Sequence, residues 1–277
     1  MCRWLAYWGA PLRLTDVLYT PVHSLIDQSL HSKLGAETTN GDGFGIGWYD
    51  DVSDTPGVFR STEPAWNDTN LRELSAHTRS PLFFAHIRAA IGSSVQQTNC
   101  HPFRYKRWLW MHNGFIDGLS DIKRDLAFAV DPTLYLHISG TTDTELMFYL
   151  ALTFGLEDDP PGAVARTIGF VEARGREHGH QFPFQGTIAT SNGESLWAFR
   201  YSSAGRSRSL YFNRSVPQLR EMYPDRAVLR EVADDARLVV SEPVGDLPGA
   251  WIEVPEATYG VVSKDHEELL PFAPAAA

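Results

Sequence analysis

The chain has 277 residues, of which 43% are hydrophobic and 21% charged, as in an ordinary globular protein with one large domain or two small ones. Its formal net charge is -10, and its 24 Lys and Arg residues are scattered among 34 Asp and Glu residues without forming a basic block. We therefore expect no nucleic-acid partner and no anionic membrane partner.

Strand-like segments dominate the first half of the chain. Each is short, apolar or aromatic, and bounded by Gly, Pro, Asn or Asp. They cover residues 4–8, 44–49, 82–88 and 107–112. Several lack alternation between apolar and polar residues, which predicts sheets that are covered on both faces.

Helical periodicity appears at residues 67–78, 119–129, 143–154 and 161–177. The third of these segments has the sharpest start, because Thr142 and Glu145 have the spacing of a capping box. This start places Asp143 in the first helical turn.

Strand patterns return after Gly179, at residues 185–190, 195–201, 209–213, 237–241, 251–254 and 258–262. The order of predicted elements along the chain is strands, then helices, then strands. This order predicts an α+β protein with layered antiparallel sheets, and it argues against a doubly wound fold, in which strands and helices alternate regularly. No internal repeat or long linker divides the chain. We expect one domain over residues 2–265 and a disordered tail over residues 266–277.

Two cysteines are too few for a disulfide framework in a chain of this size, and neither has the spacing of a metal site. The N-terminus lacks the pattern of a signal peptide, and nowhere do about 18 apolar residues run together, the length that spans a bilayer. We expect a soluble cytoplasmic protein that loses only Met1.

Cys2 follows the initiator methionine, and its small side chain permits removal of Met1. The mature residue then carries both a thiol and a free α-amine. An α-amine of pKa about 7.7 to 8.0 can act as general base toward a thiol of pKa about 8.5, so such an N-terminal nucleophile needs no histidine. Alone, the residue is weak evidence, because position 2 can be occupied by chance.

Gly43, Gly45 and Gly47 alternate with large apolar residues in one strand-like segment. The apolar face can pack into a core, and the bare face lets a backbone or a ligand come close. A tight contact between sheets and a wall of an active site both explain the pattern. No Lys-Ser/Thr pair or helix start follows, which argues against a phosphate-binding loop.

Polar residues stand at the ends of two predicted strands, with His-Ile-Arg at residues 86–88 and His-Asn-Gly at residues 112–114. Rigid scaffolds often present reactive groups at such ends. The Asn113 amide and the Gly114 N–H could form an oxyanion hole, and Arg88 could bind a carboxylate through a forked contact. The alternatives are an ordinary Asn-Gly turn and a solvated or ion-paired arginine.

Asp143 also has two interpretations. It could be a counter-charge for a substrate ammonium, or it could be favoured by the helix dipole without any further role. The histidines at positions 86, 101, 112, 178 and 180 have no recognised ligand spacing, so we assign no metal and no cofactor.

Taken in order, these motifs resemble those of the class II glutamine amidotransferases. They are Met1-Cys2, Asp-Gly-Phe-Gly at residues 42–45, His-Ile-Arg at 86–88, His-Asn-Gly at 112–114 and Thr-Asp-Thr-Glu at 142–145. The set is most similar to the standalone members, which include γ-glutamyl amidases of ergothioneine synthesis and glutathione breakdown. The resemblance implies the N-terminal nucleophile hydrolase fold, a four-layer αββα sandwich of two antiparallel sheets.

The resemblance also implies a role for each motif. Cys2 would attack the γ-carbonyl of glutamine or another γ-glutamyl amide, with its own α-amine as base. Asn113 and the Gly114 amide would stabilise the oxyanion. Arg88 would hold the substrate's α-carboxylate and Asp143 its α-ammonium, while water releases glutamate from a γ-glutamyl thioester.

The chain departs from the family pattern in three respects. Phe44 stands where the usual motif is Asp-Gly-Trp-Gly, and Ala89 and Ala90 replace the hydroxyl residue that larger members use to touch the substrate. We also expect no synthetase domain on this chain, which leaves hydrolysis or delivery of ammonia to a separate synthetase or peptidase-like partner. A third hypothesis is a non-catalytic ligand-binding regulator on the same fold. We expect Cys100 to be a buried structural thiol.

Overall fold

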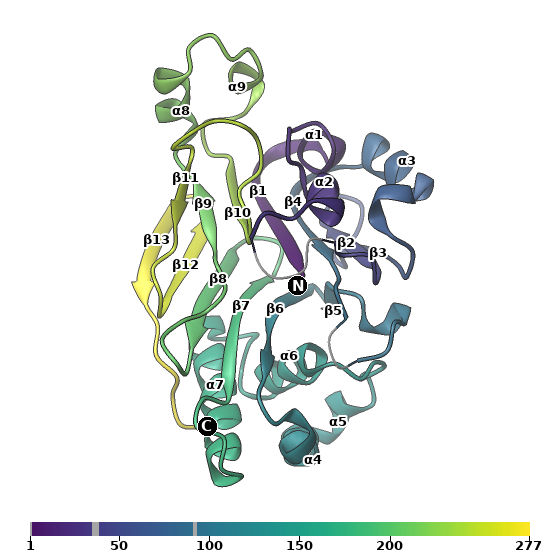
Figure 1. Ribbon diagram of the computed structural model, residues 1–277, viewed down its shortest axis with the longest axis vertical. Coiled ribbons are helices and arrows are strands. Elements are labelled where there is room, and N and C mark those ends of the chain that lie inside the picture. Colours follow the sequence, from purple (N-terminus) through teal and green to yellow (C-terminus); the bar gives the residue numbers. More distant parts are fainter. Residues whose placement is uncertain (1, 35–38, 91–92) are drawn as a thin grey trace.

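The computed structural model describes residues 2–34, 39–90 and 93–277, which form two stacked antiparallel sheets (Figure 1). The strands of sheet A follow the spatial order β11 (Trp251–Glu253), β9 (Tyr211–Asn213), β10 (Arg237–Val240), β1 (Arg3–Arg13), β4 (Arg79–Ile87), β2 (Phe44–Trp48) and β3 (Gly57–Ser61). Those of sheet B follow the order β13 (His266–Pro271), β12 (Thr258–Ser263), β8 (Leu196–Ser202), β7 (Phe184–Ser191), β6 (Trp108–Ile116) and β5 (Phe103–Tyr105).

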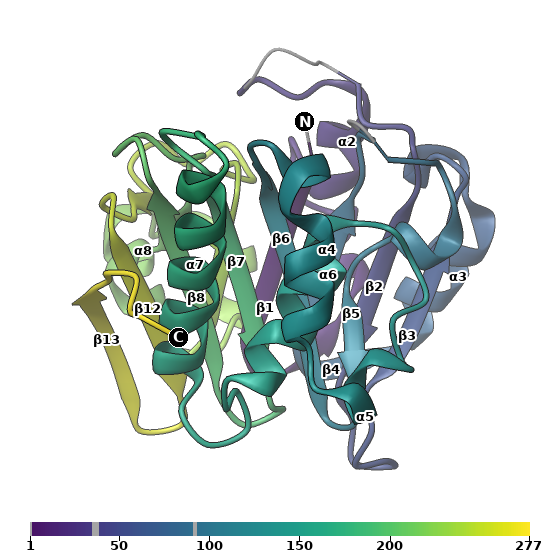
Figure 2. The ribbon, with the colours of Figure 1, turned by 90° about the horizontal axis from the view of Figure 1, so that it is seen from below.

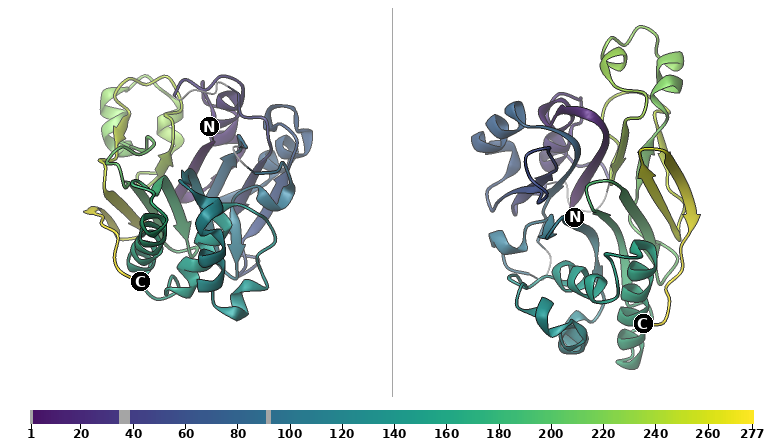
Figure 3. Two further views of the ribbon diagram at one scale, coloured as in Figure 1. Left: turned by 60° about the horizontal axis from the view of Figure 1, so that its bottom comes forward. Right: turned by 180° about the vertical axis from the view of Figure 1, so that it is seen from behind.

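Helices cover the outer face of each sheet (Figures 2 and 3). Those over sheet A are α1 (Thr15–Leu18), α2 (Leu25–Leu30) and α3 (Thr69–His77). Those over sheet B are α4 (Leu119–Ala129), α6 (Asp143–Thr153) and α7 (Pro160–Glu177), with α5 (Pro132–Tyr135) beside α6. The remaining elements are α8 (Val216–Met222), α9 (Val228–Glu231) and the short 3-10 helices η1 (Ala65–Asn67) and η2 (Gln97–Asn99). Among the described residues, no helix has the length and apolar character needed to cross a membrane.

Buried apolar clusters separate these layers. Phe148 belongs to the cluster between sheet B and its helices, and Phe83 to the cluster between sheet A and its helices. The next residue on β4, Phe84, points to the opposite face, where it joins Trp4 and Met111 between the two sheets. Burying each such ring stabilises the fold by about 1.5–3 kcal/mol. The predicted α+β class and four-layer αββα sandwich are confirmed.

The helix boundaries follow the sequence pattern closely. α4 coincides with its predicted range, and α6 and α7 each differ from theirs by one residue at one end. The Thr142 hydroxyl caps α6 by accepting the Glu145 N–H at 3.2 Å. The Glu145 carboxylate does not complete a capping box, because it accepts the N–H groups of Ser139 at 2.9 Å and Gly140 at 2.6 Å.

The C-terminal segment differs from the expected disordered tail. Residues 266–271 form β13, which pairs with β12 along its length. Phe272 is buried, and its ring lies 5.3 Å from the ring of Phe199, measured between centroids. The side chains of β13 are mostly exposed, so the strand has no apolar face from which it could be predicted.

The bare glycine face of β2 packs against the segment 100–102. A Cβ added at Gly45 would overlap the carbonyl oxygen of His101, and one at Gly43 would lie 2.7 Å from Cys100 Sγ. Both glycines are therefore required by close packing, as one explanation expected, but the partner is the irregular segment 100–102 and not a second sheet. Cys100 is fully buried, as expected.

We predict that Gly45→Ala lowers the free energy of unfolding by about 1–3 kcal/mol, since the new methyl group would overpack against a backbone oxygen. Urea unfolding followed by circular dichroism measures this loss. Gly260→Ala on β12 is the matched control, because its added Cβ would first meet the flexible end of the Leu269 side chain, at 3.1 Å. Equal losses in the two variants would contradict the packing explanation.

Candidate active site

Cys2 directly precedes β1, an inner strand of sheet A. β1 pairs with β4 so that Arg3 stands opposite Ile87, which brings Cys2 beside the residues that follow β4. The half-buried Sγ accepts the Ala89 N–H at 3.4 Å and donates to the Ala89 carbonyl oxygen at 3.5 Å. These contacts hold the thiol against the end of β4.

Asn113 on β6 connects sheet B to Cys2. Its buried side chain donates from Nδ2 to the Cys2 carbonyl oxygen at 2.8 Å. An amide nitrogen carries two hydrogens, so one contact leaves a second hydrogen for another acceptor. Gly114 follows on the same strand, where an added Cβ would overlap the backbone oxygen of Gln185. Thus Asn113 contacts Cys2, and the close packing around the next position favours glycine.

Arg88 is buried at the end of β4, which excludes the alternative of a solvated arginine. Its Nη2 donates to Ser93 Oγ at 2.6 Å and to the Ser94 carbonyl oxygen at 3.1 Å. Its Nη1 donates to the Asp42 carbonyl oxygen at 3.4 Å. Arg88 therefore has a hydroxyl partner in Ser93, five positions further along the chain.

Asp143 begins α6, in the first helical turn as predicted. Its half-buried carboxylate accepts the Thr144 N–H at Oδ1, 2.7 Å away. A negative charge at this end of a helix is stabilised by the helix dipole.

The charges of Arg88 and Asp143 both act on the Cys2 thiol. Burial raises the pKa of Cys2, whereas the Ala89 N–H and the charge of Arg88 lower it, and the charge of Asp143 raises it. Opposite charges near one thiol are the complement of a zwitterion, which carries one charge of each sign. The structure therefore brings the charged and polar candidates to one place.

Three histidines far apart in sequence gather beside Arg88. His86, His101 and His112 are all buried, and the first two have ring centroids 4.0 Å apart. Burial lowers the pKa of His86 to about 3, and it lowers the pKa of His101 and His112 as well. All three rings are therefore neutral near pH 7. No group of three His, Cys, Asp or Glu residues in the described parts of the chain is arranged to hold a metal ion.

A buried ion pair anchors the start of β1. Arg3 donates from Nε to Glu242 Oε2 at 2.7 Å and from Nη1 to the Cys2 carbonyl oxygen at 3.0 Å. Glu242 also accepts the Lys33 N–H at 2.9 Å, and its Oε1 lies 2.6 Å from His23 Nε2. Sequence reasoning missed this network because Arg3 and Glu242 are 239 positions apart and belong to no common motif.

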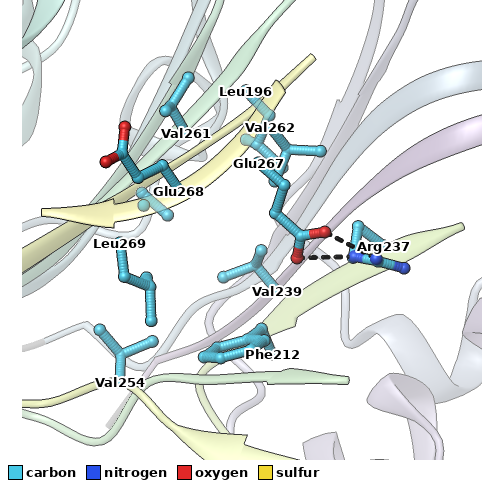
Figure 4. A pocket seen from close by; sticks show the side chains of 12 residues that line it. Leu196, Phe212, Arg237, Val239, Val254, Val261, Val262, Glu267, Glu268 and Leu269 are labelled. Carbon is cyan, nitrogen blue, oxygen red and sulfur yellow. Dashed lines mark hydrogen bonds and ion pairs between the residues drawn. The ribbon is translucent and has the colours of Figure 1, made fainter. Parts of the chain in front are cut away.

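A cavity of about 330 Å³ lies elsewhere, between the two sheets (Figure 4). Apolar side chains from both sheets line it, among them Phe212, Val239 and Leu269. Arg237 forms an ion pair with Glu267 in its lining, with Nη2 and Oε2 2.6 Å apart. The predicted site residues lie outside this lining, so the cavity is separate from the candidate active site.

Comparison with known proteins gives the family. The family described as glutamine amidotransferases class-II matches residues 17–239, which is well over half of the chain. The chain belongs to the class II glutamine amidotransferases. The enzyme family indicated by the order of the sequence motifs is thereby confirmed.

Two curated relatives of this amidotransferase extend over nearly all of it. The probable glutamine amidotransferase DUG3 of Saccharomyces cerevisiae is 32% identical, over 98% of this chain and 84% of its own length. The gamma-glutamyl-hercynylcysteine sulfoxide hydrolase of Mycolicibacterium smegmatis is 28% identical, over 98% of this chain and 100% of its own length. The similarity to standalone members of the family is confirmed.

Solved structures agree with this assignment. The glutamine aminotransferase class-II domain protein of Silicibacter pomeroyi has a TM-score of 0.76 and 32% identity, over 99% of this chain and 100% of that one. The glutamine phosphoribosylpyrophosphate amidotransferase of B. subtilis has a TM-score of 0.64 and 13% identity, over 99% of this chain and 50% of that one. At that identity the second likeness shows the fold alone, and it supports the N-terminal nucleophile hydrolase fold.

We predict that Glu242 stabilises the amidotransferase at neutral pH and not in acid. Burial raises the pKa of Glu242, but the Lys33 N–H and the Arg3 charge outweigh burial, so the folded-state pKa lies below its ordinary value. A carboxyl group of this kind contributes stability above its unfolded pKa of about 4.3 and loses the contribution as the pH falls through the folded pKa.

Glu242→Gln should therefore lower the free energy of unfolding by about 3 kcal/mol at neutral pH, and by progressively less in acid. Urea unfolding over a series of pH values measures the difference from wild type. Glu267→Gln is the matched control, because Glu267 lies in a more exposed ion pair with Arg237 and should cost less than about 1 kcal/mol. A loss for Glu242→Gln that does not change with pH would refute the assignment.

Proposed function

We propose that this class II glutamine amidotransferase hydrolyses glutamine or another γ-glutamyl amide, with Cys2 as an N-terminal nucleophile. The observation that carries the proposal is the contact between Asn113 and Cys2, at a thiol whose pKa responds to both Arg88 and Asp143. The site thus combines a nucleophile, an oxyanion donor and two opposite charges. The relative from Mycolicibacterium smegmatis, a γ-glutamyl compound hydrolase by name, supports this reaction class.

The first step is activation of the thiol. Removal of Met1, which lies outside the described residues, frees the α-amine of Cys2. This amine has an ordinary pKa of about 7.7 to 8.0 and takes the thiol proton. Because burial raises the pKa of the Cys2 thiol, a base on the same residue is what makes the thiolate accessible near neutral pH.

The thiolate then attacks the γ-carbonyl carbon, and the π electron pair of the carbonyl moves to its oxygen. The second hydrogen of the Asn113 amide and the Gly114 N–H stabilise this oxyanion. When the tetrahedral intermediate collapses, the C–N bond breaks and the proton held by the Cys2 α-amine passes to the leaving amine. A γ-glutamyl thioester remains on Cys2.

Water completes the reaction. It gives a proton to the Cys2 α-amine and attacks the thioester carbon, after which the C–S bond breaks, the thiol is regenerated and glutamate is released. Throughout, Arg88 binds the α-carboxylate of the glutamyl group and Asp143 binds its α-ammonium.

A second candidate function is delivery of ammonia to a separate protein. It is favoured by the relative from Saccharomyces cerevisiae, which is named a probable glutamine amidotransferase. The chemistry is the same up to the thioester, and the released ammonia passes to an acceptor on a partner. Stable co-purification with a synthetase or peptidase-like protein that increases glutaminase activity would support this function.

We predict that Cys2→Ala abolishes glutamate release from a panel of glutamine and γ-glutamyl amides, whereas Cys100→Ala retains it. The Cys100 thiol is buried and donates to the Ser61 carbonyl oxygen at 3.3 Å, so it is a matched control for loss of a thiol. Mass spectrometry should find the acyl adduct on Cys2 alone. Equal activity of wild type and Cys2→Ala, or inertness of both across the panel, would contradict the proposal.

We also predict that the native protein lacks Met1, because only then is the α-amine of Cys2 free. Intact-mass measurement of protein from its natural host decides this point. A retained methionine, together with ligand binding and no turnover, would instead favour the non-catalytic regulator.

A further inference from the structure

Asp143 belongs to a chain of hydrogen bonds that ends on β6. Its Oδ1 accepts the Thr144 N–H at 2.7 Å and lies 3.2 Å from Thr144 Oγ1. Thr144 Oγ1 in turn lies 3.1 Å from Nδ1 of His112, the neighbour of Asn113. Thr144 and His112 are each only 2% exposed, so water does not compete for these contacts. The start of α6 is thereby linked to the strand that carries the oxyanion donor.

The chemistry of the three groups determines the direction of both side-chain hydrogen bonds. A carboxylate can only accept, so the Thr144 hydroxyl donates its single hydrogen to Asp143. The Thr144 oxygen can then only accept from His112, which must carry its hydrogen on Nδ1. Burial lowers the pKa of His112, although the Asp143 charge raises it, and the ring is therefore neutral. Its Nε2 has no partner of hydrogen-bond length and angle among the described residues, and the Gln185 backbone raises the pKa of the ring less than burial lowers it.

The His112 ring is fixed in place by its neighbours. It stacks on Phe184, with ring centroids 5.7 Å apart and an interplanar angle of 22°. A Cβ added at Gly114 or at Gly186 would crowd Nε2 of the ring, so these two glycines leave the space that the imidazole fills. This packing restricts rotation of the imidazole ring and keeps its Nδ1 directed at Thr144.

The side-chain hydrogen bonds that Asp143 forms with the described residues are all on Oδ1, which leaves Oδ2 for a ligand. We propose that Thr144 and His112 are positioning residues that hold Asp143 so that Oδ2 meets the α-ammonium of the substrate. They make the site selective for γ-glutamyl groups over glutaryl groups, which lack the α-amine. The inference rests on the proposed function, in which Asp143 binds that ammonium.

The selectivity follows from preorganisation. A carboxylate that is already oriented loses less conformational freedom on binding an ammonium than a mobile carboxylate does. L-Glutamate carries the α-ammonium, whereas glutarate has the same two carboxylates and no ammonium. The ratio of their affinities therefore isolates the contact at Asp143 from the contact at Arg88.

Calorimetric titration of the full-length protein with L-glutamate and with glutarate tests the proposal. We expect wild type to prefer L-glutamate. Thr144→Val keeps the side-chain shape and removes the hydroxyl, so it should reduce this preference about tenfold, through weaker L-glutamate binding alone. His112→Phe keeps the stacking on Phe184 and removes the Nδ1 donor, and it should shift the preference in the same direction. If Thr144→Val does not fold, the ratio of L-glutamate to glutarate affinity in His112→Phe tests the proposal instead.

Two variants serve as controls. Thr144→Ser retains the hydroxyl and should keep the wild-type preference. Thr190→Val removes another fully buried threonine hydroxyl, one that donates to the Leu109 carbonyl oxygen at 2.9 Å, and should also leave the preference unchanged.

Thr144→Val that keeps the preference, or that weakens both ligands equally, would overturn the proposal. So would a wild-type protein that binds the two ligands equally well. Failure of the hydrolase proposal would give a different result. The protein would still prefer L-glutamate in a way that depends on Thr144, but it would cleave no γ-glutamyl amide.

Discussion

The hydrogen bond from Asn113 Nδ2 to the Cys2 carbonyl oxygen joins the two sheets at the residue proposed as nucleophile. Cys2 precedes a strand of sheet A, whereas Asn113 belongs to sheet B. The stacking of the sheets therefore sets the distance between the proposed nucleophile and the proposed oxyanion donor. If these roles hold, the apolar cluster between the sheets, which includes Trp4 and Met111, acts on the rate as well as on stability, because a displacement of about 1 Å at reacting groups can cost two orders of magnitude in rate.

The two charges of the site are each satisfied by neutral groups. Arg88 contacts the hydroxyl of Ser93 and the carbonyl oxygen of Ser94, and Asp143 contacts the N–H and hydroxyl of Thr144 at a helix start. Among the described residues no ion pair compensates either charge, so the proposed zwitterionic ligand would bind both without first breaking one there. Arg88 follows a strand and Asp143 begins a helix. Because the two residues lie on different elements, each can be mutated without changing the backbone that holds the other.

Local sequence patterns were sufficient for the long helices, because periodicity and capping act over a few residues. The range of α4 and the Thr142 cap of α6 are examples. By contrast, β6 continues to Ile116, beyond the strand end predicted at residue 112. β13 was missed because its mostly exposed side chains form no apolar face. The order of the motifs predicted a set of site residues, but not their contacts. The ion pair of Arg3 with Glu242 and the gathering of the buried histidines depend on how whole sheets pair and stack, which no short window of sequence records.

The position of β1 within sheet A has a consequence for biosynthesis. β1 lies between β4 and β10, and β10 is made only after most of the chain has left the ribosome. Until then the first strand has at most one of its two neighbours, and Arg3 has not yet met Glu242. In a nascent chain in this state β1 is an edge strand, and the backbone N–H and C=O groups on its open side stay unpaired until β10 arrives. β1 is therefore the strand of sheet A that waits longest for its second neighbour during synthesis.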